Sequence, residues 1–259
     1  EPDVDSWALE ISGLARFLEG HLALLPPGTQ TTEFGARGAA VAVPTDFVVR
    51  LTHAWQSGSD RNQPRLPAGH TLDTVIGMVT GAARGLGHAI AVALAEAGAD
   101  VALGLRDVSR DGGVVEAVER LGRRALPLQL DVTRLDEVKA GVGRCVEALG
   151  SLDVLVNTAG IAPGDIPAEE VSLADFERTV DVNLKGTFFA CQAAFEPMRR
   201  QGFGRIVNVS SQAGIVALPG ESVYCLTKAG VAHLTRCLAV EWGRHGIQVN
   251  AVAPTFVRT

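Results

Sequence analysis

The chain has 259 residues, of which 47% are hydrophobic, and carries a formal net charge of -6 with an isoelectric point near 5.5. That length and apolar content suffice for one substantial core, whereas the acidic balance, the lack of an apolar run of roughly 18 residues and the absence of a secretory-type N-terminus argue against nucleic acid, a membrane span or export. We therefore expect a cytoplasmic protein with a small-molecule partner.

Residues 1–70 form a segment that differs in composition from the rest of the chain. Six of the twelve prolines and two of the three tryptophans lie within it. An amphipathic stretch, a Pro-Pro stop and a polar loop follow one another here, but their pattern assigns no chemistry. We predict an N-terminal extension of unknown role, residues 1–70, ahead of one main domain, residues 71–259.

Residues 71–259 alternate short runs rich in Val, Ile and Leu with longer helical patterns, which is typical of βαβ units around a parallel sheet. Two S/T-x-x-D pairs, Ser172 with Asp175 and Thr133 with Asp136, predict capped helix starts. Six strands are expected, at 74–80, 100–105, 126–131, 153–157, 205–210 and 247–252.

The first of these strands runs into a glycine-rich turn, Thr80 to Gly87, which opens a helical stretch. A turn without Cβ atoms lets the backbone approach a pyrophosphate, and the helix N-terminus offers free N–H groups and a positive dipole end. Strand, turn and helix together predict an α/β fold of the Rossmann type, a doubly wound parallel sheet that binds a dinucleotide.

The end of the second strand bears on the choice between NAD and NADP, because a carboxylate there accepts from the ribose 2'-OH but repels a 2'-phosphate. That position is Leu105, which Arg106 follows, and Arg84 lies inside the glycine turn. Two guanidinium groups suit a phosphate, so NADP(H) is favoured. NAD(H) stays open if Arg106 is a solvated surface residue and Asp107 turns back to the ribose.

Tyr224, the single tyrosine of the chain, and Lys228 stand four residues apart in the helical segment 223–242. Both side chains therefore project from one face of the helix. A nearby ammonium favours the phenolate and would bring the pKa of the phenol from about 10 toward a range useful for acid/base catalysis. We expect this pair to carry the chemistry, although such a pair alone is more often a surface contact.

These residues, in this order over residues 71–259, resemble the short-chain dehydrogenase/reductase family. The motifs that carry the resemblance are the glycine turn, Asp131-Val132, Asn157-Thr158-Ala159-Gly160, Asn183, Ser211 and Tyr224-x-x-x-Lys228. The resemblance implies an oxidoreductase that moves a hydride between a nicotinamide cofactor and a secondary alcohol or ketone.

The resemblance also implies the catalytic roles. Tyr224 would exchange the proton, Lys228 would lower its pKa and bind the nicotinamide ribose, and Ser211 would hold the substrate oxygen, with Ser210 as the alternative. Asn183 would anchor a water in the proton relay, or satisfy backbone groups at a helix irregularity, and both roles are compatible. No metal is expected, because the cysteines and histidines lack the spacing of ligands.

The cofactor contacts expected from the turn, the arginines and the resemblance span the carboxyl ends of the strands. They are Thr80, Gly81, Arg84, Gly85, Leu86, Gly87, Arg106, Asp131, Val132, Asn157, Ala159, Gly160, Tyr224, Lys228, Pro254, Thr255, Val257 and Thr259. Members of the family usually carry asparagine at the position of Thr158, and we expect this departure to affect stability more than chemistry.

Relatives continue past the position of Thr259 with a substrate-covering segment and a seventh strand. We therefore expect a domain that is incomplete at its C-terminus and lacks the last strand, although residues 65–72 resemble that strand weakly and leave an N-terminal replacement open. An uncovered edge strand favours association. The stripe Val231, Leu234, Leu238 and Trp242 is either core or part of a homodimer or homotetramer interface.

Two stretches, 210–214 and 221–225, are similar to those of family members that act on sugars and polyols. An NADP(H)-dependent enzyme for such secondary alcohols or their ketones is therefore the leading hypothesis. One alternative is a 3-oxoacyl thioester reductase with an acidic carrier protein as partner, for which Arg199, Arg200 and Arg205 are the candidate basic patch, or a solvated face. The other is a nucleotide-binding module without turnover.

Overall fold

The computed structural model describes residues 74–255. The predicted N-terminal extension and the last four residues, which include Val257 and Thr259, lie outside these described residues. The division of the chain near residue 70 therefore remains a prediction.

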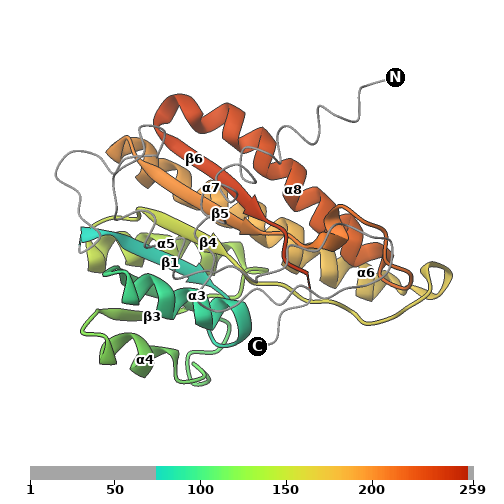
Figure 1. The fold of residues 1–259 in the computed structure, drawn as a ribbon, viewed down its shortest axis with the longest axis horizontal. Helices are drawn as coiled ribbons and strands as arrows, with labels where there is room; N and C mark the ends of the chain where they lie inside the picture. Colours follow the sequence, from blue (N-terminus) through green and yellow to red (C-terminus); the bar gives the residue numbers. More distant parts are fainter. Residues whose placement is uncertain (1–73, 256–259) are drawn as a thin grey trace, which may run out of the picture. The chain divides into compact units, whose positions relative to one another are not determined.

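The described residues form one six-stranded sheet in the order β3-β2-β1-β4-β5-β6, and every neighbouring pair is parallel (Figure 1). This is the doubly wound order expected, and each predicted strand is found to within two residues. The strands are β1 (Ile76–Thr80), β2 (Asp100–Leu105), β3 (Ala125–Gln129), β4 (Val154–Asn157), β5 (Gly204–Val209) and β6 (Ile247–Val252).

Helices connect the strands and cover the sheet. The main helices are α3 (Gly85–Glu96), α4 (Val114–Arg120), α5 (Leu135–Leu149), α6 (Leu173–Val180), α7 (Gly186–Gln201) and α8 (Ser222–Trp242). Within residues 74–255, none of them contains an apolar stretch long enough to cross a bilayer.

The two predicted helix caps have different outcomes. Ser172 is the N-cap of α6, and its hydroxyl accepts a hydrogen bond from the Asp175 N–H at 3.1 Å, as predicted. The cap at Thr133 is wrong, because α5 begins one residue later than that cap requires, with Arg134 at the N-cap position. The Thr133 hydroxyl donates to the Asp131 carboxylate at 2.8 Å.

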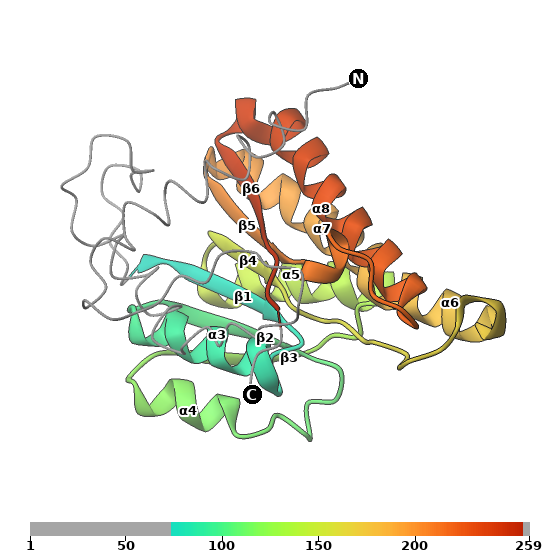
Figure 2. The same ribbon diagram turned by 45° about the vertical axis from the view of Figure 1, so that its right-hand side comes forward.

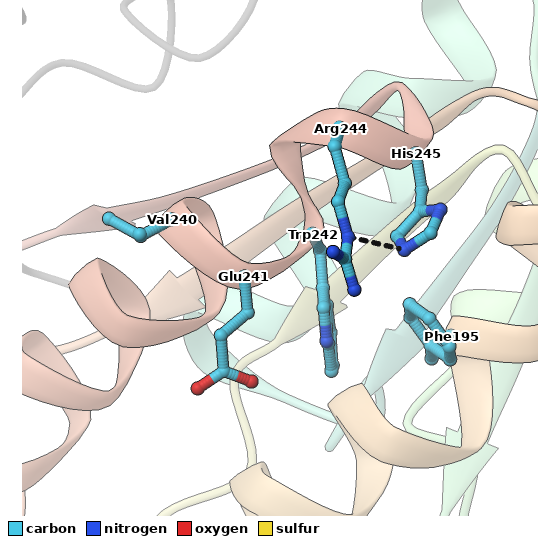
Figure 3. A pocket seen from close by; sticks show the side chains of 6 residues that line it. All are labelled: Phe195, Val240, Glu241, Trp242, Arg244 and His245. Carbon is cyan, nitrogen blue, oxygen red and sulfur yellow. Dashed lines mark hydrogen bonds between the residues drawn. The ribbon is translucent and has the colours of Figure 1, made fainter.

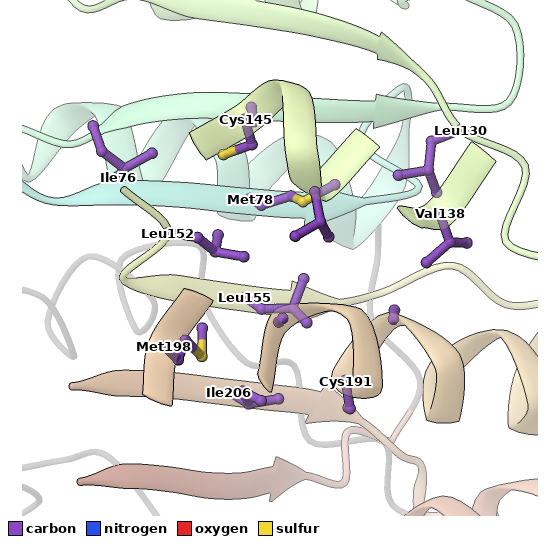
Figure 4. Close-up of a cluster of buried hydrophobic side chains, with 14 of the residues drawn as sticks. Ile76, Met78, Leu130, Val138, Cys145, Leu152, Leu155, Cys191, Met198 and Ile206 are labelled. Carbon is purple, nitrogen blue, oxygen red and sulfur yellow. The ribbon is translucent and has the colours of Figure 1, made fainter. Parts of the chain in front are cut away.

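Apolar side chains on the two faces of the sheet form two separate cores. On one face, Met78, Leu155 and Ile206 pack against buried residues of α5 and α7, such as Cys145 and Cys191 (Figure 4). On the other face, alternate residues of β1, β2 and β4 pack against α3 and α4, which lie together in the turned view of Figure 2. The period-2 alternation of strand side chains thus supplies both cores.

Three residues of the apolar stripe of α8 pack in the first core: Leu238, which is 5% exposed, belongs to it, and the partly buried Leu234 and Trp242 pack against it. Val231 is 1% exposed. Of the two interpretations of this stripe, the core one is confirmed, because α8 packs against β6; its part in an interface between copies stays a prediction.

Strand β1 lies at the point where the order of the strands reverses, since it pairs with β2 on one side and with β4 on the other. In open α/β sheets, ligands bind outside the carboxyl ends of the strands at such a switch point. The ends of β1 and β4 and the loops that follow them therefore define where the site lies.

Candidate active site

The glycine turn after β1 requires glycine at specific positions. Gly81 has φ +70 and Gly85 has φ +58, a region that residues with a Cβ rarely adopt. A Cβ on Gly87 would lie 2.3 Å from the Gly81 carbonyl oxygen, so the first turn of α3 packs directly on the preceding loop. The Gly81 and Ala82 N–H groups both donate to the Gly104 carbonyl, which ties the turn to the end of β2.

The N-terminus of α3 is open to an anion. Arg84 occupies the N-cap position but makes no side-chain cap, and the first turn of the helix carries no acidic residue. The first N–H groups of a helix have no partner within it and attract negative charge. A cradle that excludes Cβ atoms, with an uncapped helix end beneath it, fits the pyrophosphate of a dinucleotide.

The end of β4 packs on this turn through Thr80 and Thr158. The Thr158 hydroxyl donates to the Thr80 carbonyl, and the Thr158 N–H donates to the Thr80 hydroxyl at 3.2 Å. Ala159 lies so close that a Cβ on Gly81 would meet its Cα at 2.9 Å. Thr158, the departure from the family pattern, thus joins two strand ends and has no direct place among the acid/base groups.

Asn157 and Gly160 face in different directions. The buried Asn157 amide donates to the Asn208 side chain at 2.9 Å and to the Cys191 sulfur at 3.3 Å, so its side chain lies in the interior rather than at the surface. Gly160 is exposed and lies beside the catalytic candidates: a Cβ on it would be 3.4 Å from Asn183 Oδ1 and 3.5 Å from Lys228 Nζ.

At the end of β2 the structure separates the candidate cofactor-selecting residues. Leu105 is fully buried, whereas Arg106 is exposed. The Asp107 carboxylate accepts from the Ser109 hydroxyl at 2.6 Å and from the Ser109 N–H at 3.0 Å. These hydrogen bonds, first that from the hydroxyl, hold the pKa of Asp107 below its ordinary value and keep its carboxylate within its own loop.

Asp131 and Val132 follow β3 as predicted. The half-buried Asp131 accepts from the Thr133 N–H at 2.9 Å, and its own N–H donates to Glu137 at 2.8 Å. Val132 is buried and packs against Gly186, on which a Cβ would lie 2.8 Å from the valine side chain. Both residues are therefore fixed at the edge of the site.

Lys228 is a buried cation. It is 5% exposed, and its ammonium donates to the Val209 carbonyl at the end of β5 at 2.8 Å. Its Nζ lies 5.7 Å from the centroid of the Tyr224 ring, so the two residues share one face of α8 as predicted. Burial lowers the pKa of Lys228 to about 8.

Tyr224 is half-buried, and its pKa lies above the ordinary value. Burial is the main cause, and the negative field of Glu221 adds to it, while a hydrogen bond with Ser211 acts in the opposite direction. The lowered pKa expected from Lys228 is therefore wrong for the described chain, because burial of the phenol raises its pKa more than the hydrogen bond with Ser211 lowers it. At neutral pH the hydroxyl of Tyr224 is protonated and able to donate.

The structure distinguishes Ser211 from Ser210. The buried Ser210 hydroxyl donates to the Lys228 carbonyl at 2.8 Å and so links β5 to α8. Ser211 is half-buried, hydrogen-bonded with Tyr224, and accepts from the Ala213 N–H at 3.2 Å at the start of a short 3-10 helix, Gln212–Gly214. Ser211, not Ser210, therefore shares the open side of the site with Tyr224.

Asn183 lies in a π-helical turn, Asp181–Lys185, between α6 and α7. Its buried amide donates to the Ile161 carbonyl at 2.8 Å, and its Oδ1 accepts from the Ile161 N–H at 2.8 Å. It also donates to the Thr227 hydroxyl at 3.1 Å. Asn183 thus satisfies backbone groups at a helix irregularity, as one of the two hypotheses predicted, and holds the loop after β4 against α8.

Three groups that position the catalytic candidates were not predicted from the sequence. They are Thr227, the Val209 carbonyl and the backbone of Ile161. Thr227 precedes Lys228 on α8, so its place in the helix was a signal, whereas the two backbone groups carry no sequence signature. At the far end of the site, the Pro254 carbonyl accepts from the Gln212 N–H at 2.9 Å, which brings Pro254 and Thr255 next to the loop of Ser211.

A pocket of about 320 Å³ lies elsewhere, between α7 and the end of α8 (Figure 3). Its lining residues are Phe195, Val240, Glu241, Trp242, Arg244 and His245. Trp242 stands 14 residues beyond Lys228 on α8, which at 1.5 Å per residue is roughly 21 Å. This pocket is therefore separate from the candidate active site.

Residues 75–259 match the family model described as short chain dehydrogenase. The chain belongs to this family. D-threitol dehydrogenase of Mycolicibacterium smegmatis is 42% identical over 190 residues, 73% of this chain and 72% of that protein. A 3-oxoacyl acyl-carrier-protein reductase of Staphylococcus aureus is 42% identical over 181 residues, 70% of this chain and 73% of that protein.

Solved structures agree with this assignment. The crystal structure of NAD+-bound xylitol dehydrogenase superposes with a TM-score of 0.71 at 30% identity and covers 73% of each chain. The short-chain dehydrogenase described here is thus an oxidoreductase that acts on alcohol groups with a nicotinamide dinucleotide. Among residues 74–255, His, Cys, Asp and Glu side chains form no group suited to a metal ion.

Proposed function

We propose that this enzyme interconverts a sugar or polyol and the corresponding ketone with NADP(H). The observation that carries the proposal is the convergence of Ser211 and Tyr224 on one open side, with the Lys228 ammonium behind them. The 42% identity to a D-threitol dehydrogenase supports the substrate class. The same fold hosts many reactions, so the proposed activity depends on the chemical roles of the residues in this site.

Tyr224 is the acid/base and Ser211 the residue that holds the substrate oxygen. In the direction of reduction, the protonated Tyr224 hydroxyl donates its proton to the carbonyl oxygen, while the Ser211 hydroxyl donates a hydrogen bond to the same oxygen. In oxidation Tyr224 accepts the proton of the substrate hydroxyl. The raised pKa of Tyr224 favours the donor form at neutral pH.

Lys228 and Asn183 support Tyr224. The Lys228 ammonium, which like Asn183 Oδ1 lies beside Gly160, would stabilise the phenolate when it forms and bind a ribose hydroxyl. Asn183 positions the loop after β4 through Ile161 and, with Lys228, flanks the place where a relay water would lie. The bound cofactor supplies or accepts the hydride.

The residues that would hold the dinucleotide follow the strand ends in order. The backbone of the glycine turn would bind the pyrophosphate, Asp131 and Val132 the adenine, and Gly160 with the Pro254 loop the nicotinamide side. Asn157 would contribute through its backbone, because its side chain is engaged inside the protein. Val257 and Thr259 would also contact the cofactor, as the resemblance to the family implies.

NADP(H) is favoured over NAD(H) by the charges near the 2' position. Arg84 and Arg106 are exposed, and no ion pair holds either guanidinium among the described residues. The Asp107 carboxylate accepts two hydrogen bonds from Ser109 and pairs with Arg110, so it is held toward its own loop. Exposed arginines without an ion-pair partner suit a phosphate.

The charges around the site favour a neutral hydroxylated substrate over a carrier-bound thioester. Glu221 lies near Tyr224, and Asp165 packs against Gly220 beside it. The basic residues considered for a carrier protein lie at the opposite edge, because Arg205 precedes Ser211 by six strand residues, roughly 20 Å. Arg199 and Arg200 are moreover paired with Glu196.

The test is a spectrophotometric assay of the purified chain with NADP+ and with NAD+. Threitol, xylitol and related polyols form one arm, and a 3-oxoacyl thioester with NADPH forms the other. We expect polyol-dependent appearance of the reduced nicotinamide band with NADP+. Turnover of the thioester alone would replace the proposed substrate class, and a lower KM for NAD+ than for NADP+ would overturn the cofactor assignment.

A further inference from the structure

The loop between β2 and α4, residues 106–113, packs directly on the glycine turn. Gly112 has φ +64, and a Cβ on it would lie 2.0 Å from the Ala83 carbonyl oxygen. No side chain fits at that distance, so the two backbones are in contact at this point. Gly113 has a similar φ of +76, but a Cβ there would meet nothing within 4 Å.

Both ends of this loop are fixed. At its start, the Arg106 carbonyl accepts from the Gln129 side chain at 2.9 Å. At its end, the Asp111 carboxylate accepts from the Gly113 and Val115 N–H groups at 3.2 and 3.3 Å, at the first turn of α4. The glycine turn itself is bound to Gly104, two residues before Arg106. Turn and loop therefore form one unit.

The positive and negative side chains of this unit differ in their partners: two arginines are exposed, whereas the carboxylate of Asp107 is bound within the loop. Arg84 directly follows Ala83, the residue that Gly112 contacts, and Arg106 begins the loop. The Asp107 carboxylate is turned to the Ser109 hydroxyl and N–H, with Arg110 at 3.5 Å. The contact at Gly112 thus holds two arginines on one unit while the loop binds its own carboxylate.

We propose that Gly112 is a positioning residue that sets the preference for the 2'-phosphate of NADP(H). The inference rests on the proposed use of NADP(H) and extends it to residues that do not touch the cofactor. Displacing Gly112 from Ala83 shifts the turn at Ala83, and with it the adjacent Arg84, relative to Arg106, which β2 and Gln129 hold in place; this disturbs the geometry that binds a phosphate. The 2'-OH of NAD(H) needs no such geometry, so binding of NAD(H) is insensitive to the contact.

The experiment compares Gly112→Ala with the matched control Gly113→Ala. Both variants place a Cβ at a positive φ, but only that of Gly112→Ala meets the turn. Dissociation constants for NADP+ and NAD+ are measured by calorimetry at one ionic strength, without turnover. We expect Gly112→Ala to weaken NADP+ about tenfold, or about 1.4 kcal/mol. NAD+ should stay within about twofold, and Gly113→Ala should change both constants by similar factors.

A double variant separates positioning from general damage. In the Arg106→Gln background, Gly112→Ala should have little further effect on the ratio of the two constants, because the pair of guanidinium groups is already incomplete. If Gly112→Ala loses the native circular dichroism spectrum, the exposed Ser109→Ala decides instead, since it removes the hydroxyl hydrogen bond that helps to hold Asp107 in its loop and should also lower the preference for NADP+. An unchanged ratio in the deciding variant overturns the inference and leaves NADP(H) use intact. A wild type that prefers NAD+ overturns both.

Discussion

Replacing Lys228 with methionine tests whether the enzyme maintains a buried charge at the expense of stability. The Lys228 side chain is 5% exposed, and burial lowers its pKa from 10.5 to about 8. Methionine has a similar length and no charge, so Lys228→Met removes the ammonium with little change in packing. The comparison of the two proteins over pH isolates the titration of this one group.

The magnitude and sign follow from the shift of the pKa. One pKa unit corresponds to about 1.4 kcal/mol, so a drop from 10.5 to about 8 means that the folded state bears a cost of about 3 kcal/mol at pH 7. The folded state binds this proton less tightly than the unfolded state does. The cost is therefore fully present below pH 8 and disappears as the pH rises from about 8 to 10.5.

The assay is urea unfolding of both proteins at pH 7 and pH 10, at one protein concentration. From pH 7 to pH 10, we expect the free energy of unfolding of the wild type to rise relative to that of Lys228→Met by about 2 to 3 kcal/mol. A constant difference would show that Lys228 is not a buried cation. If the free energy of unfolding of the wild type instead fell relative to that of Lys228→Met as the pH rises, the ammonium would be stabilised in the folded state.

The other predictions concern cofactor choice, the strand-end contact, pH and assembly. Arg106→Asp should weaken NADP+ about tenfold or more, and an unchanged NADP+ constant would make Arg106 a plain surface residue. Thr158→Val should cost on the order of 1 kcal/mol of stability through the lost bond to Thr80 while kcat stays near the wild-type value; a large loss of kcat would contradict this. Because the pKa of Tyr224 is raised, kcat for alcohol oxidation should increase as the pH rises above neutral, and a flat profile would oppose this role. Sedimentation at micromolar concentration should show a homodimer or homotetramer, because apolar side chains are exposed on α6, α7 and α8, namely Leu173, Phe176, Phe188 and Leu226. A single species of 27.1 kDa would refute this prediction.

The fold was largely predictable from the sequence, for a physical reason. Buried parallel strands are apolar on both faces, so each strand stands out as a short run of Val, Ile and Leu. The glycine turn was predictable for another reason, because a positive φ at Gly81 and a close backbone contact at Gly87 exclude other residues there. Both features depend on residues that are adjacent in the sequence, so the sequence alone reveals them.

The electrostatics of the site were not predictable in the same way. The spacing of Tyr224 and Lys228 placed them on one face of α8. The direction in which the pKa of Tyr224 shifts, however, depends on its burial in the folded chain. The partner of Lys228 is a backbone carbonyl, that of Val209, and a carbonyl has no sequence signature. The cap predicted at Thr133 failed because α5 begins at Leu135, with Arg134 at the N-cap position.

The measurement that tests the central claim most directly is the kinetics of Tyr224→Phe. This variant deletes only the hydroxyl that transfers the proton, so it should bind NADP+ with the wild-type affinity while kcat falls about 100- to 10,000-fold. The dissociation constant for NADP+ is the control for an intact cofactor site. A Tyr224→Phe enzyme that keeps more than about half of the wild-type kcat, against an acid/base contribution of that size, would remove Tyr224 from the mechanism.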